Sequence, residues 1–425
     1  MKRTIDVCIG DAGRLVGRLH YNQDGRRESA IFEYDQSWLA SPDRFAIDPA
    51  LPLVPERQFR RKSDGGSVFP GAIADTEPDG WAMRVIRRDH AKRRSNPDPL
   101  DRVALPPILG GLDFLLAVDD YSRIGALRFR DEHHEYCRTP AAGQRRAPPL
   151  IELRQMLAST HAVETDTETA EDLAYLRGRG TSLGGMRPKC TVVDDRGQLL
   201  IAKFPSIQDS GPVTAGEVLA LRLARAAGID AAEADLVDSD GTPVALIRRF
   251  DRSKADRIPY LSAATLLQAE PDDGAEHAYT ELVDEMRRHA AYPTRDIVEL
   301  WRRIVFSVLI TNTDDHLRNH GFLHAGGDLW RLAPAFDLNP FPGRARELKT
   351  WISEEAGPSA TIDGALGALP RFGIPLTTAR EILGEVDAAV STWRTIGRSL
   401  GMTARDFDYF AEAFEHGERV GNRSR

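Results

Sequence analysis

The sequence predicts an α+β protein with two lobes, because the order of its elements changes from strands to helices near residue 252. Two hairpin patterns precede that point, at residues 190–204 and 234–252. In each, two apolar runs flank a short polar turn, which is typical of antiparallel strands. After residue 252 the apolar residues recur mostly at helical spacing. We therefore expect a β-rich lobe followed by a helical lobe, with a cleft between them.

The first 111 residues read as a small module of their own. The runs TIDVCIG, RLVGRLHY and SAIFEYD are separated by Asp, Gly and Asn residues and predict three strands. We expect this module to end near LPPILGG, at residue 111, and residues 112–252 and 253–425 to form the two lobes. Within the first lobe, RIGALRFRD predicts a strand, and LIELRQMLAST and AEDLAYLRG predict helices.

Two longer helices are predicted with more detail. In TAGEVLALRLARAAGI, Thr214 and Glu217 have the spacing of a capping box, and Gly228 is a helix-terminating glycine. The run LWRRIVFSVL places its apolar residues on one stripe, which predicts a helix with one buried face. The residues of this stripe are Trp301, Ile304, Val305, Val308 and Leu309.

Composition is that of a water-soluble globular protein. The 425 residues are 41% hydrophobic and 28% charged, with a formal net charge of −8. An acidic chain is a poor candidate for binding DNA or membranes by charge alone. The three cysteines have no C-x-x-C spacing, which argues against a disulfide framework or a cysteine zinc site. Without a signal-peptide pattern or a long apolar run, we expect a cytoplasmic protein with no membrane partner.

The most polar segment of the helical half is NTDDHLRNHGF, directly behind the apolar helix. Asp314 and Asn319 have the D-x-x-x-x-N spacing of a kinase catalytic loop, and Asp337 follows in the apolar run PAFDLNP. Phosphoryl transfer requires a carboxylate that receives the proton of the acceptor hydroxyl. It also requires an amide and a second carboxylate that hold Mg²⁺ against the phosphates. Two other interpretations stay open: a solvated polar helix end, or a metal site that uses His316 and His320.

A kinase also needs a lysine for the nucleotide phosphates. Lys203 is the only charged residue in the strand pattern LLIAKF, and a buried lysine requires an acidic partner. Glu217 in the next helix is a candidate partner, although helix capping alone would also explain a glutamate there. The glycine-rich stretch GRGTSLGGMRPK, residues 178–189, can bind anionic oxygens through backbone N–H groups, or it is a plain linker. LIRRFDR, residues 246–252, is the expected hinge between the lobes.

Taken together, SLGGMRPK, IAKFP, RRFDR, NTDDHLRNHGF and PAFDLNP resemble, in order and spacing, the HipA-like serine/threonine kinases. These are the toxins of HipA–HipB toxin–antitoxin pairs. GRLVGRLHY and LPLVP resemble the N-terminal subdomain of that family, so the similarity spans nearly the whole chain. The resemblance implies a two-lobed, protein-kinase-like fold with an additional small N-terminal subdomain.

The resemblance also implies roles for single residues. Asp314 matches the catalytic base, and Asn319 and Asp337 match the Mg²⁺ ligands. The residues matched to ATP binding are Lys203, Glu217, the hinge residues Arg248 and Phe250, and Ser182, Gly184, Gly185 and Lys189 of the phosphate loop. Ser182 matches a serine that is autophosphorylated in the family, and a phosphate there would repel those of a nucleotide.

For partners, the family implies a HipB-like helix-turn-helix antitoxin, contact with DNA only through that antitoxin, and a protein substrate such as an aminoacyl-tRNA synthetase. Two further functions stay open at this stage. The kinase scaffold could serve mainly as a corepressor that binds the antitoxin, or the chain could phosphorylate a small molecule, because metabolite kinases share the D-x-x-x-x-N device. Nucleotide turnover and the identity of the labelled product separate these possibilities.

Overall fold

The chain folds into two compact units. The computed structural model describes residues 1–59, 66–78, 80–96, 105–139, 147–177, 185–253, 256–270, 275–343 and 345–419. Unit 1 comprises Met1–Gln208 and Asp238–Leu261, and unit 2 comprises Asp209–Val237 and Ser262–Arg425. The chain therefore passes from one unit to the other three times.

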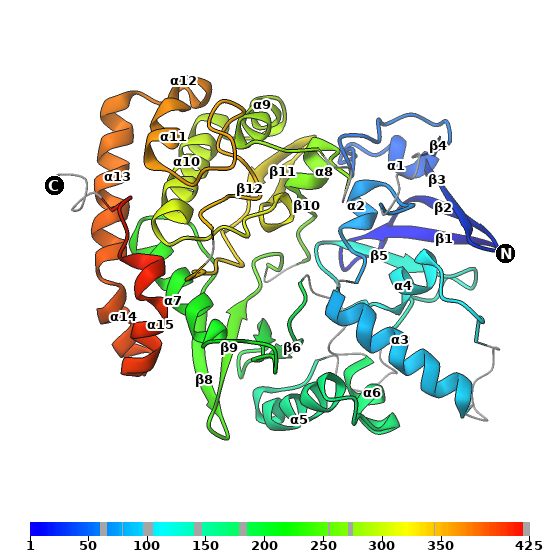
Figure 1. The fold of residues 1–425 in the computed structure, drawn as a ribbon. Helices are drawn as coiled ribbons and strands as arrows, with labels where there is room; N and C mark the ends of the chain where they lie inside the picture. The colour runs from blue at the N-terminus through cyan, green and yellow to red at the C-terminus, as the bar shows by residue number, and fades with distance from the viewer. Residues whose placement is uncertain are drawn as a thin grey trace. The chain divides into compact units, whose positions relative to one another are not determined.

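The N-terminal part of unit 1 is an antiparallel sheet in the order β4-β3-β2-β1-β5 (Figure 1). Its strands are β1 (Lys2–Ile9), β2 (Arg14–Asp24), β3 (Arg27–Tyr34), β4 (Gln58–Phe59) and β5 (Leu127–Arg130). The first three confirm the strands predicted from the runs between turn residues. Leu19 of β2 and Phe32 of β3 lie opposite each other and are both buried. β5 pairs with β1 although more than a hundred residues separate them in the chain.

Unit 1 also contains six helices within the described residues. They are α1 (Gln36–Leu39), α2 (Gly71–Ala74), α3 (Gly80–Ser95), α4 (Gly111–Ala117), α5 (Leu153–Glu164) and α6 (Ala170–Arg177), with a 3-10 turn at Leu150–Glu152. α5 and α6 confirm the two predicted helices. α3 is joined to α6 by an ion pair of 2.7 Å between Asp89 and Arg177.

The second sheet has the order β6-β7-β9-β8. Its strands are β6 (Lys189–Val193), β7 (Leu199–Lys203), β8 (Ala234–Ser239) and β9 (Thr242–Arg248). Both predicted hairpins are therefore confirmed. At the turn between β8 and β9, Asp240 and Gly241 have φ of 54° and 80°. Two consecutive residues with positive φ suit the tight hairpin turns that Asp-Gly favours.

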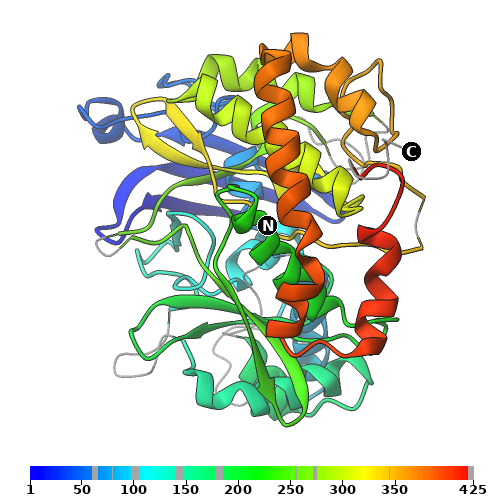
Figure 2. The same ribbon diagram turned by 90° about the vertical axis from the view of Figure 1, so that its left-hand side faces the viewer.

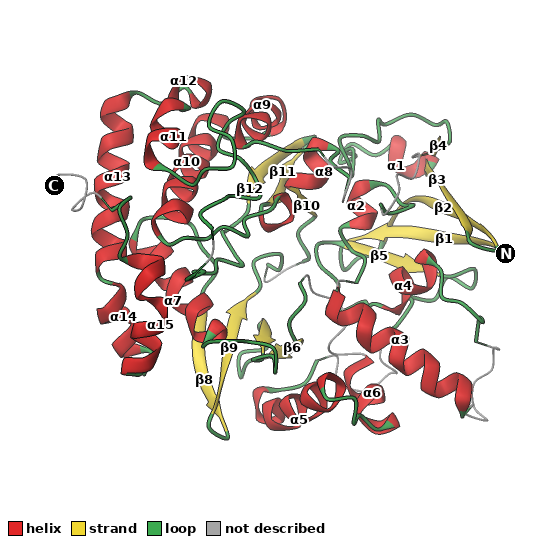
Figure 3. Ribbon diagram, viewed as in Figure 1, coloured by secondary structure: helices red, strands yellow, loops and turns green. Residues whose placement is uncertain are grey.

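Unit 2 is mostly helical, as the red ribbons of Figure 3 show. Its helices are α7 (Val213–Ala226), α8 (Ala263–Leu267), α9 (Tyr279–His289), α10 (Pro293–Leu309), α11 (Ile362–Gly367), α12 (Leu369–Phe372), α13 (Leu376–Ser391), α14 (Trp393–Ser399) and α15 (Ala404–Phe414). Figure 2 shows the long helix α13, in orange, running beside α10. The stripe predicted on α10 is buried throughout, so α10 is the central helix of this core.

The remaining strands of the α+β arrangement are short. β10 (Tyr260–Ser262) lies where the chain enters unit 2 for the last time, and β11 (Gly321–Gly326) pairs with β12 (Leu329–Leu332) in an antiparallel hairpin. The α+β class predicted from the sequence is confirmed. Among the residues that the structure describes, no helix combines the length and the apolar character needed to cross a membrane.

One local prediction is wrong. α7 begins at Val213, after Pro212, and its N-cap makes no side-chain hydrogen bond. Glu217 therefore lies in the second turn of the helix, too far from the N-cap to form a capping box with Thr214. Capping does not account for this glutamate, which is buried. The predicted end of the helix is confirmed, because Gly228 follows it with φ of 76°.

Candidate active site

The polar loop at the end of α10 is fixed by the backbone on both of its sides. Thr311 has a φ of 57°, which turns the chain sharply away from the helix axis. Its carbonyl oxygen accepts a hydrogen bond from the N–H of Phe341, 3.2 Å away. A 3-10 turn, Leu317–Asn319, then leads the chain into β11. The loop is thus a rigid connection between a buried helix and a strand.

The two adjacent acids of this loop have opposite environments. Asp315 is buried, and its carboxylate accepts hydrogen bonds from the hydroxyls of Tyr279 at 2.6 Å and Ser307 at 3.1 Å. Asp314 keeps 38% of its side chain exposed. Asp315 therefore anchors the loop to the core, and Asp314 is the acid available for chemistry.

The surroundings of Asp315 explain the second histidine of the motif. The Nε2 atom of His320 lies 3.1 Å from a carboxylate oxygen of Asp315 and 3.3 Å from the Tyr279 hydroxyl. Burial alone would raise the pKa of Asp315, but the charge and hydrogen bond of His320 hold that pKa below its usual range. His320 is thus part of the anchor, which argues against the alternative that it ligates a metal together with His316.

Asn319 is oriented by Asp314 itself. Its side-chain Nδ2 donates a hydrogen bond to the backbone carbonyl oxygen of Asp314 at 3.2 Å. Because the amide nitrogen is engaged in this way, the Oδ1 atom of Asn319 is directed away from the Asp314 carbonyl oxygen and can accept other contacts. The five-residue spacing thus places a carboxylate and an amide oxygen at fixed positions on one loop.

Asp337 is held against the same loop by its neighbour Asn339. The backbone N–H of Asn339 donates to the Oδ1 atom of Asn312 at 3.2 Å. The side-chain amide of Asn339 donates to the carbonyl oxygen of Asp337 at 3.2 Å. Asp337 has a φ of 55°, a left-handed conformation that is uncommon outside glycine. The structure thus joins the PAFDLNP segment to the loop that carries Asp314 and Asn319.

The pKa of His316 depends on burial and on the nearby carboxylates. Burial lowers the pKa of His316, although the negative charges of Asp314 and Asp337, in that order, oppose the shift. The ring therefore stays neutral at neutral pH. The charges of Asp314 and Asp337 therefore act on the same ring.

One further charge belongs to this site. The Nζ atom of Lys349 lies 2.8 Å from the Oδ1 atom of Asp314. Sequence reasoning missed Lys349, because it lies in an irregular segment, RELKTW, without a recognisable motif. Only the fold brings it beside Asp314.

The nucleotide-binding candidates of unit 1 lie on the β6–β7 hairpin. Lys189 and Lys203 are directly opposite each other in the register of the two strands, so both side chains project from the same face of the sheet. Lys189 is buried, and its Nζ atom lies so close to Gly185 that an added Cβ there would come within 2.6 Å of it. Gly185, with φ of 107°, therefore allows this close approach. Ser182 and Gly184 lie outside the described residues.

The remaining candidates lie on other elements. Arg248 ends β9, where its side chain donates a hydrogen bond to Gln198, and Phe250 follows, half-buried. Glu217 lies in unit 2, on α7, whereas its expected partner Lys203 lies in unit 1. The structure thus brings Asp314, Asn319 and Asp337 together in one unit, and Lys189, Lys203 and Gly185 together in the other.

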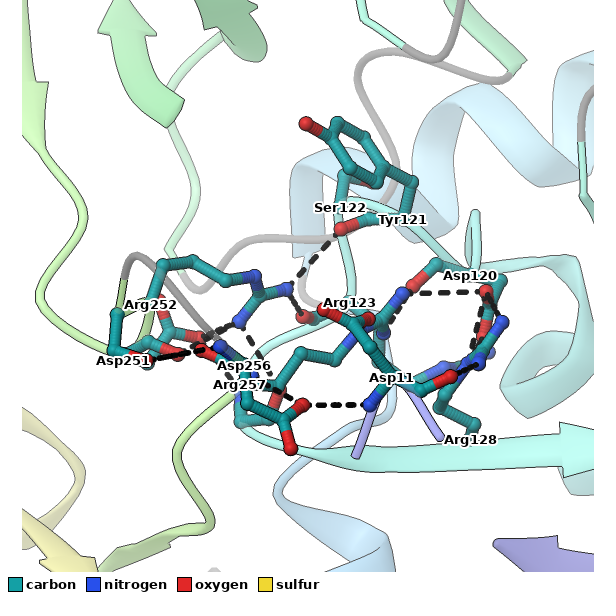
Figure 4. A network of polar contacts seen from close by, with 12 residues as sticks. Asp11, Asp120, Tyr121, Ser122, Arg123, Arg128, Asp251, Arg252, Asp256 and Arg257 are labelled. Carbon is teal, nitrogen blue, oxygen red and sulfur yellow. Dashed lines mark hydrogen bonds and ion pairs between the residues drawn. The ribbon is translucent and has the colours of Figure 1, made fainter. Parts of the chain in front are cut away.

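The segment after β9 is clamped within unit 1 by an arginine–aspartate cluster (Figure 4). Arg249 donates to Asp251 at 2.8 Å, and Asp251 also accepts from Arg252 at 2.7 Å. The same two arginines donate to the backbone carbonyl oxygen of Arg123, in the loop before β5. Burial alone would raise the pKa of Asp251, but the two arginines hold it well below its usual range.

A second part of this cluster, also drawn in Figure 4, binds the same loop. Arg257 and Arg128 both contact the Asp120 carboxylate, at 3.3 Å and 2.7 Å. Arg257 also pairs with Asp11 at 2.9 Å. In the expected hinge region, RRFDR, Arg249 and Asp251 thus hold the segment to the loop before β5. Arg248 is the last residue of β9, and Phe250 lies just beyond the strand.

The sequence matches models of known protein families and several known proteins. Residues 5–105 match the family model described as the HipA N-terminal domain, and residues 181–393 match the HipA-like C-terminal domain. The Sinorhizobium fredii protein named "Putative kinase Y4mE" is 25% identical over 351 residues, which cover 77% of this chain and 75% of that protein. A second protein of the same organism, "Putative kinase Y4dM", is 32% identical over 150 residues. These residues cover 32% of this chain and 36% of that protein.

The fold itself has a solved counterpart. The toxin–antitoxin complex of HipA, HipB and operator DNA from Shewanella oneidensis MR-1 contains a chain that matches with a TM-score of 0.62 at 15% sequence identity. The similarity covers 96% of this chain and 95% of that one, so the two chains share a fold over nearly their whole length. The sequence matches cover both domains that define the family. The chain therefore belongs to the HipA family.

Proposed function

We propose that this protein is an ATP- and Mg²⁺-dependent serine/threonine protein kinase that acts as the toxin of a toxin–antitoxin pair. The observation that carries the proposal is that Asp314 and Asn319 share one loop at the end of a buried helix, and that hydrogen bonds of Asn339 attach the Asp337 segment to this loop. Relatives of the chain are named as kinases, which supports the same class of reaction.

Asp314 would act as the base that positions the acceptor hydroxyl. Its side chain is partly exposed and projects from a loop that Asp315 anchors to the core. A carboxylate held in this way accepts a hydrogen bond from a serine or threonine hydroxyl and receives its proton as the oxygen attacks phosphorus. The rigid anchor keeps the carboxylate from turning away, which is how positioning contributes to rate.

The residues present fit a magnesium ion. Asn319 and Asp337 would hold it, because both offer side-chain oxygens and hard divalent cations prefer oxygen ligands. Among the described residues no group of three or more His, Cys, Asp or Glu side chains is placed to hold a metal. Mg²⁺ needs no such group, since phosphate oxygens and water usually complete its shell. When bound, the ion would supply positive charge against the nucleotide phosphates.

Lys203 and Lys189 would bind the phosphates of ATP. Their side chains project from the same face of the sheet, so a polyanion such as a triphosphate would contact both. Gly185 supports this role, because its missing side chain leaves room for the Lys189 ammonium group. Backbone groups near Arg248 and Phe250 would receive the adenine, on a segment that the arginine–aspartate cluster holds in place.

Partners and regulation follow from the family. We propose a HipB-like helix-turn-helix antitoxin as the partner, contact with DNA only through it, and a translation-related protein such as an aminoacyl-tRNA synthetase as the substrate. The solved relative was determined together with HipB and operator DNA, which supports the first two parts. Autophosphorylation at Ser182 would add negative charge beside the phosphate site and so lower ATP affinity.

The test is a transfer assay with an open choice of acceptor. The purified protein is incubated with γ-labelled ATP, Mg²⁺ and a cell lysate whose own kinases have been inactivated, and phosphosites are mapped by mass spectrometry. We expect label on serine or threonine of one or a few proteins, and on Ser182 of the chain itself. Label found only in small molecules would replace the proposal with a metabolite kinase. No label in any fraction would refute phosphoryl transfer as the activity.

A further inference from the structure

Among the residues that the structure describes, Lys349 forms an ion pair with the proposed catalytic base, Asp314. Its Nζ atom lies 2.8 Å from the Oδ1 atom of Asp314, and that oxygen is shielded from solvent. The lysine comes from a segment well beyond Asp337 in the chain, so the pairing is produced by the tertiary fold and not by a local motif.

The backbone on either side of Lys349 is fastened to the same loop. The N–H of Lys349 donates to the carbonyl oxygen of Thr313, 3.2 Å away. Three residues earlier, the guanidinium of Arg346 donates to the Thr311 hydroxyl and to the Val308 carbonyl oxygen, both at 2.8 Å. The segment therefore runs along the loop as a fixed neighbour, which places the lysine beside Asp314.

Stability does not explain this arrangement. The Lys349 side chain is 62% exposed and that of Asp314 is 38% exposed, and ion pairs with such exposure stabilise a fold little. The exposure has a chemical consequence instead. The ammonium group carries three N–H donors, and it borders the solvent from which an acceptor protein would approach.

We propose that Lys349 is a further catalytic residue of this kinase, which pairs with Asp314 before the reaction and binds the transferred phosphoryl group during it. The inference rests on the proposed function. The lysine would act through its charge. It would provide a cation beside the Asp314 carboxylate, which loses its negative charge, and beside the phosphate ester, which is newly formed.

The charges balance at each stage of the transfer. The acceptor oxygen forms a bond to the γ-phosphorus while the bond from that phosphorus to the bridging oxygen of ATP breaks, and its electron pair leaves with ADP. The acceptor proton passes to the Asp314 carboxylate, which becomes neutral. Lys349 thereby loses its original counter-charge at the moment when the new phosphate ester appears beside it, and the ammonium can pair with that ester.

The test uses three substitutions of Lys349 and one matched control. Lys349→Ala removes the cation, Lys349→Met keeps most of the length of the side chain, and Lys349→Arg keeps the charge. The control is Arg287→Ala, which breaks an exposed ion pair of 2.7 Å with Asp284 on α9 of the same unit. Each variant is measured for transfer from γ-labelled ATP to the lysate acceptor, for ATP affinity and for thermal unfolding.

We expect kcat of Lys349→Ala and Lys349→Met to fall about a hundredfold or more, by analogy with the loss of one charge-stabilising donor. The KM for ATP should stay within about threefold, because the lysine acts on the transferred group and not on nucleotide binding. Lys349→Arg should recover at least about tenfold of the loss. Ethylammonium added to Lys349→Ala should also recover part of the rate, which a purely structural role would not allow.

Three results would contradict a catalytic role of Lys349. Wild-type kcat in both neutral variants, or a fall of the same size in Arg287→Ala, would overturn the role of Lys349. So would a fall that neither arginine nor ethylammonium reverses. If the wild-type protein transfers no label, the proposed function fails and the inference falls with it, an outcome seen before any variant is made.

Discussion

The side-chain amide of Asn319 donates a hydrogen bond to the backbone carbonyl oxygen of Asp314 over 3.2 Å. This bond joins the residue proposed to hold magnesium to the residue proposed to take the proton. It explains why a spacing of five matters, because the 3-10 turn at Leu317–Asn319 returns the amide to the start of the loop. Loss of Asn319 should therefore disturb both the metal and the base.

The roles of Asn319 can be separated by two substitutions. Asn319→Ala removes both the oxygen ligand and the hydrogen bond, so we expect the Mg²⁺ concentration for half-maximal rate to rise at least about tenfold. Asn319→Asp keeps an oxygen ligand but loses the N–H donor. It should lower kcat while leaving the Mg²⁺ requirement near that of the wild type. Titration of the transfer rate with Mg²⁺ measures both, and identical curves for the two variants would count against this division.

The two opposed lysines of the β6–β7 hairpin should determine ATP affinity. Lys203→Met removes a charged donor to the phosphates, and a contact of that kind corresponds to about 10- to 100-fold in affinity. Lys189→Met should have an effect of the same order, since its partner in the strand register is Lys203. Arg196→Ala, in the exposed turn of the same hairpin, is the control. Calorimetric titration with ATP and Mg²⁺ measures all three, and unchanged affinity in both lysine variants would remove them from the site.

The arginine–aspartate cluster of Figure 4 should be important for the stability of unit 1. Asp251→Ala would leave Arg249 and Arg252 without their shared carboxylate, and breaking a buried pair in this way costs about 3–5 kcal/mol in the free energy of unfolding. Urea denaturation measures this loss. Asp240→Asn, which breaks an exposed pair with Arg154, should cost less than about 1 kcal/mol. Equal losses in the two variants would show that the cluster is not a structural clamp.

Unit 2 should lose stability in mild acid through His416. The Nδ1 atom of this ring accepts from the N–H of Glu418 at 3.3 Å, and its Nε2 donates to the Leu309 carbonyl oxygen at 3.1 Å, so the ring is neutral. Burial, followed by the charge of Arg346, lowers the pKa of His416 from 6.5 to about 4. Between these values the unfolded chain binds more protons, so this contribution is complete above pH 6.5 and is lost as the pH falls toward 4.

His416→Gln removes the titrating group and keeps an N–H donor. Urea midpoints are compared for wild type and variant at pH 7.5 and pH 5. We expect the wild type to lose more stability than the variant over this interval, because only its ring can take up a proton on unfolding. Parallel losses in the two proteins would assign the acid sensitivity to other groups.

Local patterns in the sequence predicted the elements well where the physical cause is itself local. The β8–β9 hairpin follows from Asp240-Gly241 between two apolar runs, and α10 follows from one buried stripe. The spacing of Asp314 and Asn319 is also local, since one turn of backbone sets it. These features require no knowledge of distant residues.

Features that depend on distant contacts could not be predicted. The pairing of β5 with β1 joins segments more than a hundred residues apart, and no pattern in either strand specifies its neighbour. The contact of Lys349 with Asp314 is of the same kind. The capping box of α7 failed for another reason. The helix already begins at Val213, with Pro212 as its N-cap, so Thr214 is a helical residue and cannot serve as the cap.

The measurement that tests the account most directly is phosphate transfer by wild type and Asp314→Asn under identical conditions, with γ-labelled ATP, Mg²⁺ and the lysate acceptor. The account predicts transfer by the wild type and a loss of about 10²- to 10⁴-fold in the variant, the usual range for a positioned base, with ATP affinity and unfolding temperature little changed. A variant that transfers label at the wild-type rate would contradict the assignment of Asp314, and with it the site built around that residue.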